Sequence, residues 1–350
     1  MKGFVSSRLH PFANLALLLL LTVATLCIAG FFTMVFNKLL FGVGMQELGN
    51  VAQNPQGHPN GWGVLMLSQG VTLLVMLGGA ALGLAAVTGY RWSEYFTPRR
   101  PVRAQWLLLA ALLIISSLPA MAVLIEWNQG IHFPGFLSGF EEWAQAKELE
   151  LKKATEFLAR LNSTARLLVA LVVLAVIPAF SEELFFRGVL QRNLVQWFNS
   201  RHVGIWLAAA IFSAIHQQFF GFVPRFVLGL VLGYLYEWSG NILVPMAAHF
   251  TQNAFQLLIL YAQQRQWSAA SFDPDSTESM PWYLVVASLL IGAGLLWYLR
   301  EQMEGTRPED EPTQLRTLGS TGVAVRQAGA ASAGARTLSH DGVDATRSEG

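Results

Sequence analysis

Long apolar stretches separated by short polar segments dominate the pattern of this chain. Eight of them are long enough, or nearly long enough, to cross a bilayer. They cover residues 12–36, 62–87, 105–125, 164–185, 203–218, 222–237, 242–262 and 281–299. The fifth and sixth are shorter than the ~20 residues that a spanning helix needs, which predicts a tight reversal or burial among other helices. We therefore predict an all-α polytopic membrane protein of about eight transmembrane helices.

The polar segments fall into two kinds. Residues 139–160 alternate Lys and Glu as an amphipathic, salt-bridged helix on a membrane surface would, and we expect them in an extracytoplasmic loop. Residues 301–350 hold few large apolar side chains, so we expect a disordered tail. The predicted organisation is N-terminal membrane helices over 1–162, a core over 163–265, a final membrane helix over 281–300, and the tail.

The composition agrees with a membrane protein. Hydrophobic residues make up 53% of the chain and charged residues only 13%, where soluble proteins have about a quarter. A net charge of +1 gives no reason to expect nucleic acid as a partner, so membrane lipid is the expected surrounding. The first apolar run is too long for a cleaved signal peptide, which favours a retained helix. The one cysteine, Cys27, cannot form an intrachain disulfide.

Basic residues predict the orientation. They precede the first predicted helix and follow the second, fourth and eighth. They are Lys2, Arg8, Arg91, Arg99, Arg100, Arg103, Arg192, Arg201 and Arg300. With eight spans these positions share one side, which the positive-inside rule makes cytoplasmic, although the lysines of the third loop oppose it. We expect an integral protein of a bacterial plasma membrane with both termini in the cytoplasm.

Three polar clusters interrupt the later apolar stretches. They read "EELFFR", "FSAIH" and "HFTQN" and contain Glu182, Glu183, Arg187, Phe212, His216, His249 and Asn253. On a helix, Glu183 and Arg187 are four residues apart and can pair, while Glu182 points about 100° away. Each cluster alone has an ordinary structural interpretation: an interfacial ion pair, a packing histidine, or an asparagine that joins helices.

Together the clusters favour a hydrolytic site. A carboxylate that apolar walls shield from water is a stronger base near neutral pH, and a neutral imidazole can relay its proton. A second histidine with an asparagine one turn away can donate hydrogen bonds to an oxyanion. The same set could also bind one divalent metal ion such as zinc, with an open position for water.

The motifs E-E-x-x-x-R, F-x-x-x-H and H-x-x-x-N, in this order, resemble the CPBP family of intramembrane endopeptidases (CAAX proteases and bacteriocin-processing enzymes, also called Abi). The resemblance covers about residues 165–262 and makes 163–265 a CAAX-protease-like catalytic core. It implies a peptide or protein substrate, with Glu182 activating the attacking water and His216 assisting. It also implies that His249 and Asn253 stabilise the oxyanion.

The same resemblance gives supporting roles to three more residues. Glu183 and Arg187 would hold the helix geometry, and Phe212 would pack beside the site. Family members have been described both as metalloproteases and as metal-independent glutamate proteases. The resemblance therefore leaves open whether Glu182, His216 and His249 hold a metal ion.

Two other functions also remain open from the sequence. One is a non-catalytic immunity or scaffold protein on the same fold, which would have no reason to retain the Glu-His-His-Asn set. The other is a proton-coupled transporter, against which the chain shows no repeat or pair of broken helices. The site residues lie at different predicted depths, which helix tilt, a kink at Pro178 or a fourth helix that continues toward Phe198 would reduce; we favour the continued helix. Gly229 and Gly233 predict close helix packing, and Arg225 is expected to extend toward the membrane interface.

Overall fold

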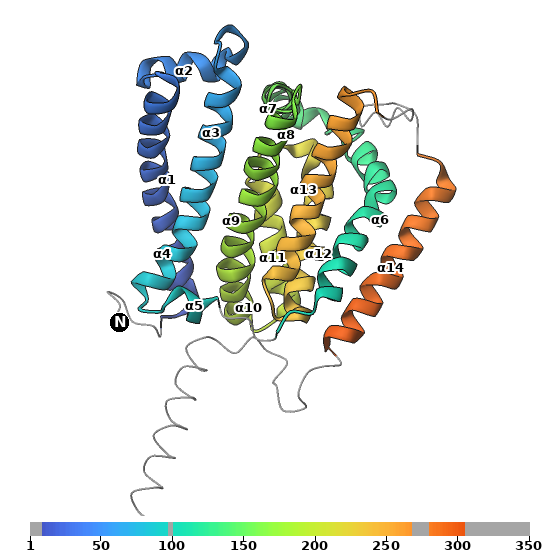
Figure 1. Cartoon of the computed structure of the whole chain (residues 1–350). Coiled ribbons are helices and arrows are strands. Elements are labelled where there is room, and N and C mark those ends of the chain that lie inside the picture. The colour runs from blue at the N-terminus through green and yellow to red at the C-terminus, as the bar shows by residue number, and fades with distance from the viewer. Residues whose placement is uncertain (1–8, 97–100, 268–279, 305–350) are drawn as a thin grey trace, which may run out of the picture.

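The structure is a computed structural model that describes residues 9–96, 101–267 and 280–304; in these ranges it contains helices and no strand (Figure 1). Six helical stretches are long and apolar enough to cross a membrane. They are Pro11–Phe41, Gly61–Val87, Ala104–Gln129, Thr164–Phe198, Phe219–Ser239 and Trp282–Glu304. The shorter apolar helix α11 (Arg201–Ala214) and the 22-residue α13 (Leu243–Gln264) complete the bundle. The predicted all-α membrane protein of about eight spans is confirmed.

The remaining elements have the following bounds. The α-helices are α1 (Pro11–Phe41), α2 (Met45–Gln53), α3 (Gly61–Leu73), α4 (Gly79–Val87), α5 (Trp92–Tyr95), α6 (Ala104–Gln129), α7 (Ser138–Leu158), α8 (Thr164–Ala170), α9 (Ile177–Phe185), α10 (Arg192–Phe198), α12 (Phe222–Ser239) and α14 (Trp282–Glu304). Three π-helical turns, η2 (Leu74–Gly78), η4 (Leu171–Val176) and η5 (Phe186–Gln191), join α-helices without interrupting the long helices that contain them. The 3-10 turns are η1 (Pro55–Gly57), η3 (Gly135–Leu137) and η6 (Phe219–Gly221).

Helix boundaries confirm some expectations and correct others. The fourth helix continues to Phe198, which is the alternative that the sequence analysis favoured. The stretch predicted as one helix over 203–218 ends earlier, at Ala214, because Gln217 adopts a left-handed conformation (φ 54°) that a helix cannot contain. The chain then reverses through η6 into α12, which is the predicted tight reversal. The last helix extends to Glu304, so residues 301–304, predicted as part of the tail, are helical; residues 305–350 lie outside the described residues.

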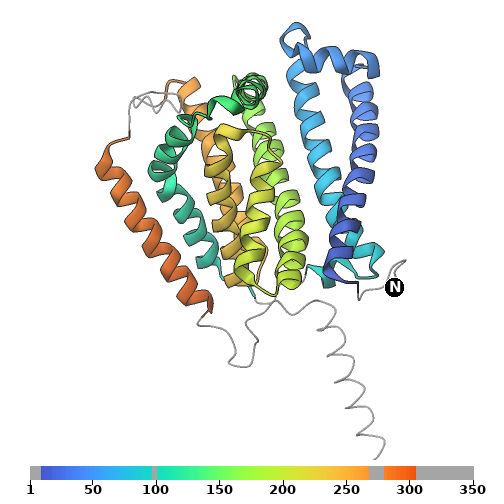
Figure 2. The ribbon, with the colours of Figure 1, turned by 180° about the vertical axis from the view of Figure 1, so that it is seen from behind.

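The fourth long helix, α8 to α10, lies at the centre of the arrangement. On one side it packs against α1, η2 and α4, where Leu77, Ala81 and Leu184 belong to one buried cluster. On its other side lie α11, α12 and α13, and α6 and α14 pack beyond them (Figures 1 and 2). Apolar side chains on the outer faces of α1 and α14 are exposed, as expected for surfaces that face lipid. The polar clusters therefore lie on a helix that protein surrounds.

The predicted amphipathic segment near 139–160 is α7. It lies at the end of the bundle away from the N-terminus, whereas α5, α10 and the last turn of α14 lie at the N-terminal end (Figure 1). Aromatic contacts hold α7 near η6: the ring of Phe219 lies 5.3 Å from that of Phe140. The connections that carry Arg91, Arg201 and Arg300 thus share one end of the bundle, as the orientation argument assumed.

Candidate functional site

The two adjacent glutamates lie in α9, halfway along the 35-residue helix Thr164–Phe198. Glu182 is 7% exposed and Glu183 is fully buried. Pro178, at the start of α9, lacks an N–H and follows directly on the π-helical turn η4, where the regular hydrogen-bond ladder is already interrupted. The long helix therefore passes Pro178 without ending. It carries both carboxylates into the protein interior.

Glu183 binds two partners with one oxygen. Its Oε1 accepts a hydrogen bond from Arg187 Nη1 at 2.8 Å, which confirms the expected pair. The same oxygen lies 2.8 Å from Nδ1 of His249, on α13. An ionised carboxylate can only accept, so His249 carries a proton on Nδ1. Glu183 therefore fixes the orientation of His249, a role that the sequence analysis did not assign to it.

His249 presents its other ring nitrogen to Glu182. Nε2 lies 3.8 Å from Oε2 of Glu182, which is too long for a direct hydrogen bond and suits a bridging water. Glu182 makes no hydrogen bond to any other residue that the structure describes. The neighbouring glutamates consequently differ: Oε1 of Glu183 accepts from two donors while its Oε2 has no partner among the described residues, and neither oxygen of Glu182 accepts a hydrogen bond from a described residue.

Phe212 joins the site residues from α11. Its ring lies 4.9 Å from the guanidinium of Arg187, 5.1 Å from the ring of His216 and 6.1 Å from that of His249. Phe212 thus packs among the other site residues. Contacts of an aromatic face with a cation and with other rings are favourable, and they join η5 to α11 and α13.

His216 lies beyond the end of α11 and is half-buried. Its Nδ1 donates to the carbonyl of Phe212 at 2.8 Å, because a carbonyl can only accept. Nε2 of the neutral ring is then a free acceptor. No hydrogen bond joins His216 to Glu182 in the part of the chain that the structure describes. His216 is thus close to the site through Phe212 rather than through the glutamate.

Asn253 follows His249 by one turn of α13 and is half-buried. Its side-chain amide makes no hydrogen bond to another described residue, so both of its N–H groups can bind a ligand. The His249–Asn253 spacing predicted from the sequence therefore leaves the two side chains on neighbouring turns, with the histidine anchored and the asparagine free.

Arg225, near the start of α12, is better connected to the site than the sequence predicted. Its Nη2 donates to Gln218, and its Nη1 is buried with no hydrogen-bond partner among the described residues. The guanidinium packs on Gly221, where any Cβ would collide with it. Its charge interacts with Glu182 and with His216. The sequence carries no signal for this, because a lone arginine at a helix start is usually interfacial.

Two glycines bring α12 close to its neighbours. A Cβ at Gly229 would lie 3.0 Å from Cβ of Ala209, and one at Gly233 would lie 2.8 Å from Ile205. The predicted packing role of the pair is confirmed. The same absence of side chains leaves their carbonyls accessible: Arg187 donates to the first and Gln191 to the second, each at 3.1 Å.

Glu182, His216 and His249, the three candidate metal ligands, do not form a recognisable metal-binding group in the described part of the chain. Among the described residues, no group of three or more His, Cys, Asp or Glu side chains could hold a metal. Nδ1 of His249 is bound to Glu183 and Nδ1 of His216 to a carbonyl, so Nε2 is the ring nitrogen without a hydrogen bond to a described residue in both histidines. A metal site of Glu182, His216 and His249 stays a prediction.

Comparison with known proteins agrees with the three motifs. Residues 164–255 match the family model described as type II CAAX prenyl endopeptidase Rce1-like. This stretch is similar to that family, and we refer to it as the Rce1-like domain. It runs from the start of α8 into α13 and contains Glu182, His216, His249 and Asn253. The family resemblance inferred from the motifs is confirmed.

One relative of the Rce1-like domain is the uncharacterized protein YpbD of Bacillus subtilis (strain 168). It is 39% identical over 88 residues, which are 24% of this chain and 42% of YpbD. The chain thus matches less than half of the length of that relative. No solved structure matches the chain. The helices outside the Rce1-like domain are described from the structure alone.

Proposed function

We propose that the chain is an intramembrane endopeptidase of the CAAX type. Its Rce1-like domain would hydrolyse peptide bonds with Glu182 as the base. The observation that carries the proposal is the division between the two glutamates: Glu183 orients His249, and Glu182 faces the free nitrogen of that histidine at 3.8 Å. The family to which the Rce1-like domain is matched consists of proteases, which supports the same reaction.

In the proposed reaction, a water molecule between Glu182 and His249 attacks the substrate carbonyl. Glu182 accepts one proton of this water as the C–O bond forms, and later gives it to the leaving amine. Nε2 of neutral His216 is a free acceptor and can relay the same proton. The carboxylate of Glu183 stabilises a positive charge on His249, as the buried carboxylate of a catalytic triad does.

The oxyanion would bind to His249 and Asn253. His249 can donate through Nε2 when it has taken a second proton from bulk water before the substrate reacts, while Nδ1 stays with Glu183. The free amide of Asn253 supplies a second donor one turn further along α13. A donor held in place before the reaction stabilises developing charge without reorganising in the transition state, and the bond to Glu183 holds His249 in this way.

The test is cleavage of a fluorogenic peptide panel, with a prenylated C-a-a-X peptide included, by the full-length protein in detergent. Glu182→Gln removes the base with almost no change in shape, and we expect cleavage to be lost. Glu126→Gln, on the exposed face of α6, is the matched control and should cleave as wild type does. Equal cleavage by wild type and Glu182→Gln would overturn the assignment of the base.

The alternative is a non-catalytic membrane immunity or scaffold protein on the same fold. It predicts that no peptide is cleaved and that folded Glu182→Gln protein functions in cells as wild type does. The free amide of Asn253 and the free carboxylate of Glu182 favour the protease, because a scaffold gains nothing from buried polar groups without partners.

The orientation is proposed as well. Both termini would face the cytoplasm of a bacterium, with α7 on the outer surface of the plasma membrane. Labelling of single cysteines with a membrane-impermeant maleimide tests this. A cysteine in α7 should react in intact cells, and one in α5 should react only after lysis.

A further inference from the structure

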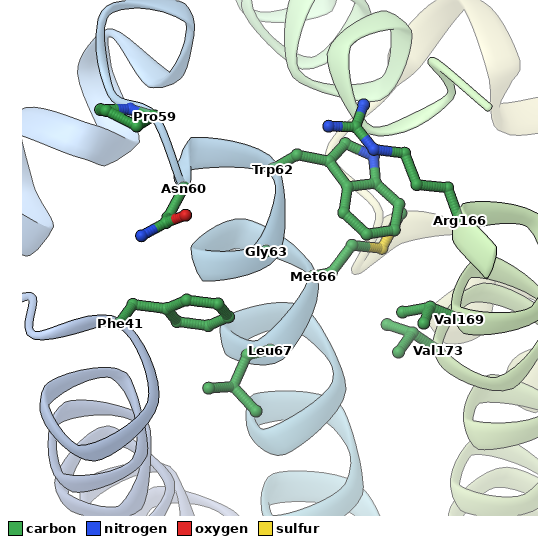
Figure 3. A pocket seen from close by; sticks show the side chains of 10 residues that line it. All are labelled: Phe41, Pro59, Asn60, Trp62, Gly63, Met66, Leu67, Arg166, Val169 and Val173. Atoms are coloured by element: carbon green, nitrogen blue, oxygen red, sulfur yellow. The ribbon is translucent and has the colours of Figure 1, made fainter. Parts of the chain in front are cut away.

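A cavity of about 460 Å³ lies between the N-terminal helices and the Rce1-like domain. Its walls come from the end of α1, the first turns of α3, and the face of α8 and η4 that turns toward them (Figure 3). Val173, the deepest lining residue on η4, precedes Glu182 by nine residues, or about 13 Å along the helix. The cavity is therefore separate from the candidate active site.

The walls of this cavity are apolar, and its mouth is basic. Phe41, Leu67, Val169 and Val173 line the interior, while Arg166 lies at the rim beside Trp62 (Figure 3). A half-open apolar cavity at the side of a membrane bundle faces hydrocarbon rather than water. Lipid chains are the molecules available to fill it. The walls by themselves would accept any lipid chain, so selectivity must come from the rim.

Arg166 is held at the rim with its charge available. Its guanidinium stacks on the indole of Trp62 at 4.7 Å, and Nε1 of Trp62 is anchored to the carbonyl of Leu158 at 2.9 Å. Nη1 donates only to the carbonyl of Arg160, at 3.4 Å, and no acidic residue of the described chain pairs with Arg166. Most of its five N–H donors are therefore free for a phosphate.

The depth of the cavity fits a lipid whose phosphate is bound at Arg166. Arg166 and Val173 are seven residues apart, about 10 Å along the helix, so a chain below the phosphate runs past Val169 to Val173. Arg160, stacked on Phe157 at 5.5 Å, places a second cation near the same rim. Tryptophan and arginine at one level are also typical of the headgroup region.

We propose that this cavity binds an anionic glycerophospholipid, with the phosphate on Arg166 and one acyl chain between α3 and η4. The lipid would fill the space between the N-terminal helices and the Rce1-like domain and add to the contacts that join them, such as the stacking of Arg166 on Trp62.

The test measures bound lipid on the full-length protein by native mass spectrometry. Protein in mixed micelles is offered phosphatidylglycerol and phosphatidylcholine with identical chains. We expect wild type to retain phosphatidylglycerol preferentially, and Arg166→Gln to lower the ratio about fivefold, the effect of one basic residue at an anionic membrane surface. Arg265→Gln is the matched control, because Arg265 lies at the C-terminal end of α13, stacks on Tyr261 at 5.4 Å and does not line the cavity.

A second pair of variants tests the chain-binding part and guards against misfolding of Arg166→Gln. Val169→Phe should fill the cavity and remove one bound lipid, whereas Val172→Phe, on the same helix but outside the cavity, should not. Wild type without preference between the two lipids would overturn the proposal. So would an unchanged ratio in folded Arg166→Gln, or equal lipid counts in the two valine variants. None of these results depends on proteolytic activity.

Discussion

Replacing Glu183 by glutamine should destabilise the protein, whereas the same replacement at the adjacent Glu182 should not. Oε1 of Glu183 accepts hydrogen bonds at 2.8 Å from both Arg187 and His249, and all three side chains are buried. Glutamine removes the negative charge and leaves the guanidinium of Arg187 as an unpaired buried cation. Breaking a buried ion pair from one side costs about 3–5 kcal/mol.

We expect a value near the lower end, about 3 kcal/mol, because Arg187 keeps the carbonyl of Gly229 and the ring of Phe212. Glu182 has no hydrogen bond to a described residue, and Nε2 of His249 is 3.8 Å from its Oε2. A neutral amide in its place relieves a buried charge. The free energy of unfolding should therefore change by less than about 0.5 kcal/mol, or increase.

The assay is reversible unfolding in mixed micelles of detergent and dodecyl sulfate, followed by tryptophan fluorescence. A loss of about 3 kcal/mol is roughly a 100-fold change in the folding equilibrium, well within its resolution. Arg187→Met in the Glu183→Gln protein should recover part of the loss, because it removes the unpaired cation. Equal stability of the two single variants, or a less stable Glu182→Gln protein, would refute the division of roles.

Three further outcomes follow from the site. Asn253→Ala should lower kcat about 100-fold, the effect of one oxyanion donor, with the Tm unchanged because its amide makes no hydrogen bond to a described residue; a parallel fall in Tm would assign it a structural role. Gly229→Val should lower the free energy of unfolding by about 1–3 kcal/mol, because the new side chain collides with Ala209. A Cβ at Gly292 meets no atom within 4 Å, so Gly292→Ala should leave the stability unchanged, and equal effects of the two variants would contradict the packing argument. Addition of EDTA should leave the Tm unchanged, because no three potential ligands gather among the described residues; a fall in Tm that zinc reverses would show a metal site.

Much of the fold could be predicted from the length and position of the apolar stretches. The exceptions arise from backbone conformation, which hydropathy does not report. The apolar pattern continues past Ala214, but the left-handed Gln217 ends the helix. The three π-helical turns are equally invisible, because they alter hydrogen bonding without altering the sequence pattern. The presence of a helix follows from the length of its apolar stretch, whereas the residue at which the helix ends depends on one or two dihedral angles.

In the site, contacts between residues close in sequence could be predicted, whereas contacts between distant residues could not. Glu183 with Arg187, and Phe212 with His216, are four residues apart, and the structure contains both contacts. Glu183 and His249 are 66 residues apart, and their hydrogen bond depends on which rotamers meet between α9 and α13. No spacing rule predicts such a contact.

The adjacent glutamates can be understood from the requirements of a base in a dry interior. Oε1 of Glu183 already accepts short hydrogen bonds from Arg187 and His249, so this carboxylate anchors those two side chains. Neighbouring positions on a helix point about 100° apart, so a second glutamate reaches the same histidine from another direction without sharing those donors. Two adjacent carboxylates are thus the shortest sequence that supplies one anchoring group and one free base beside a single imidazole.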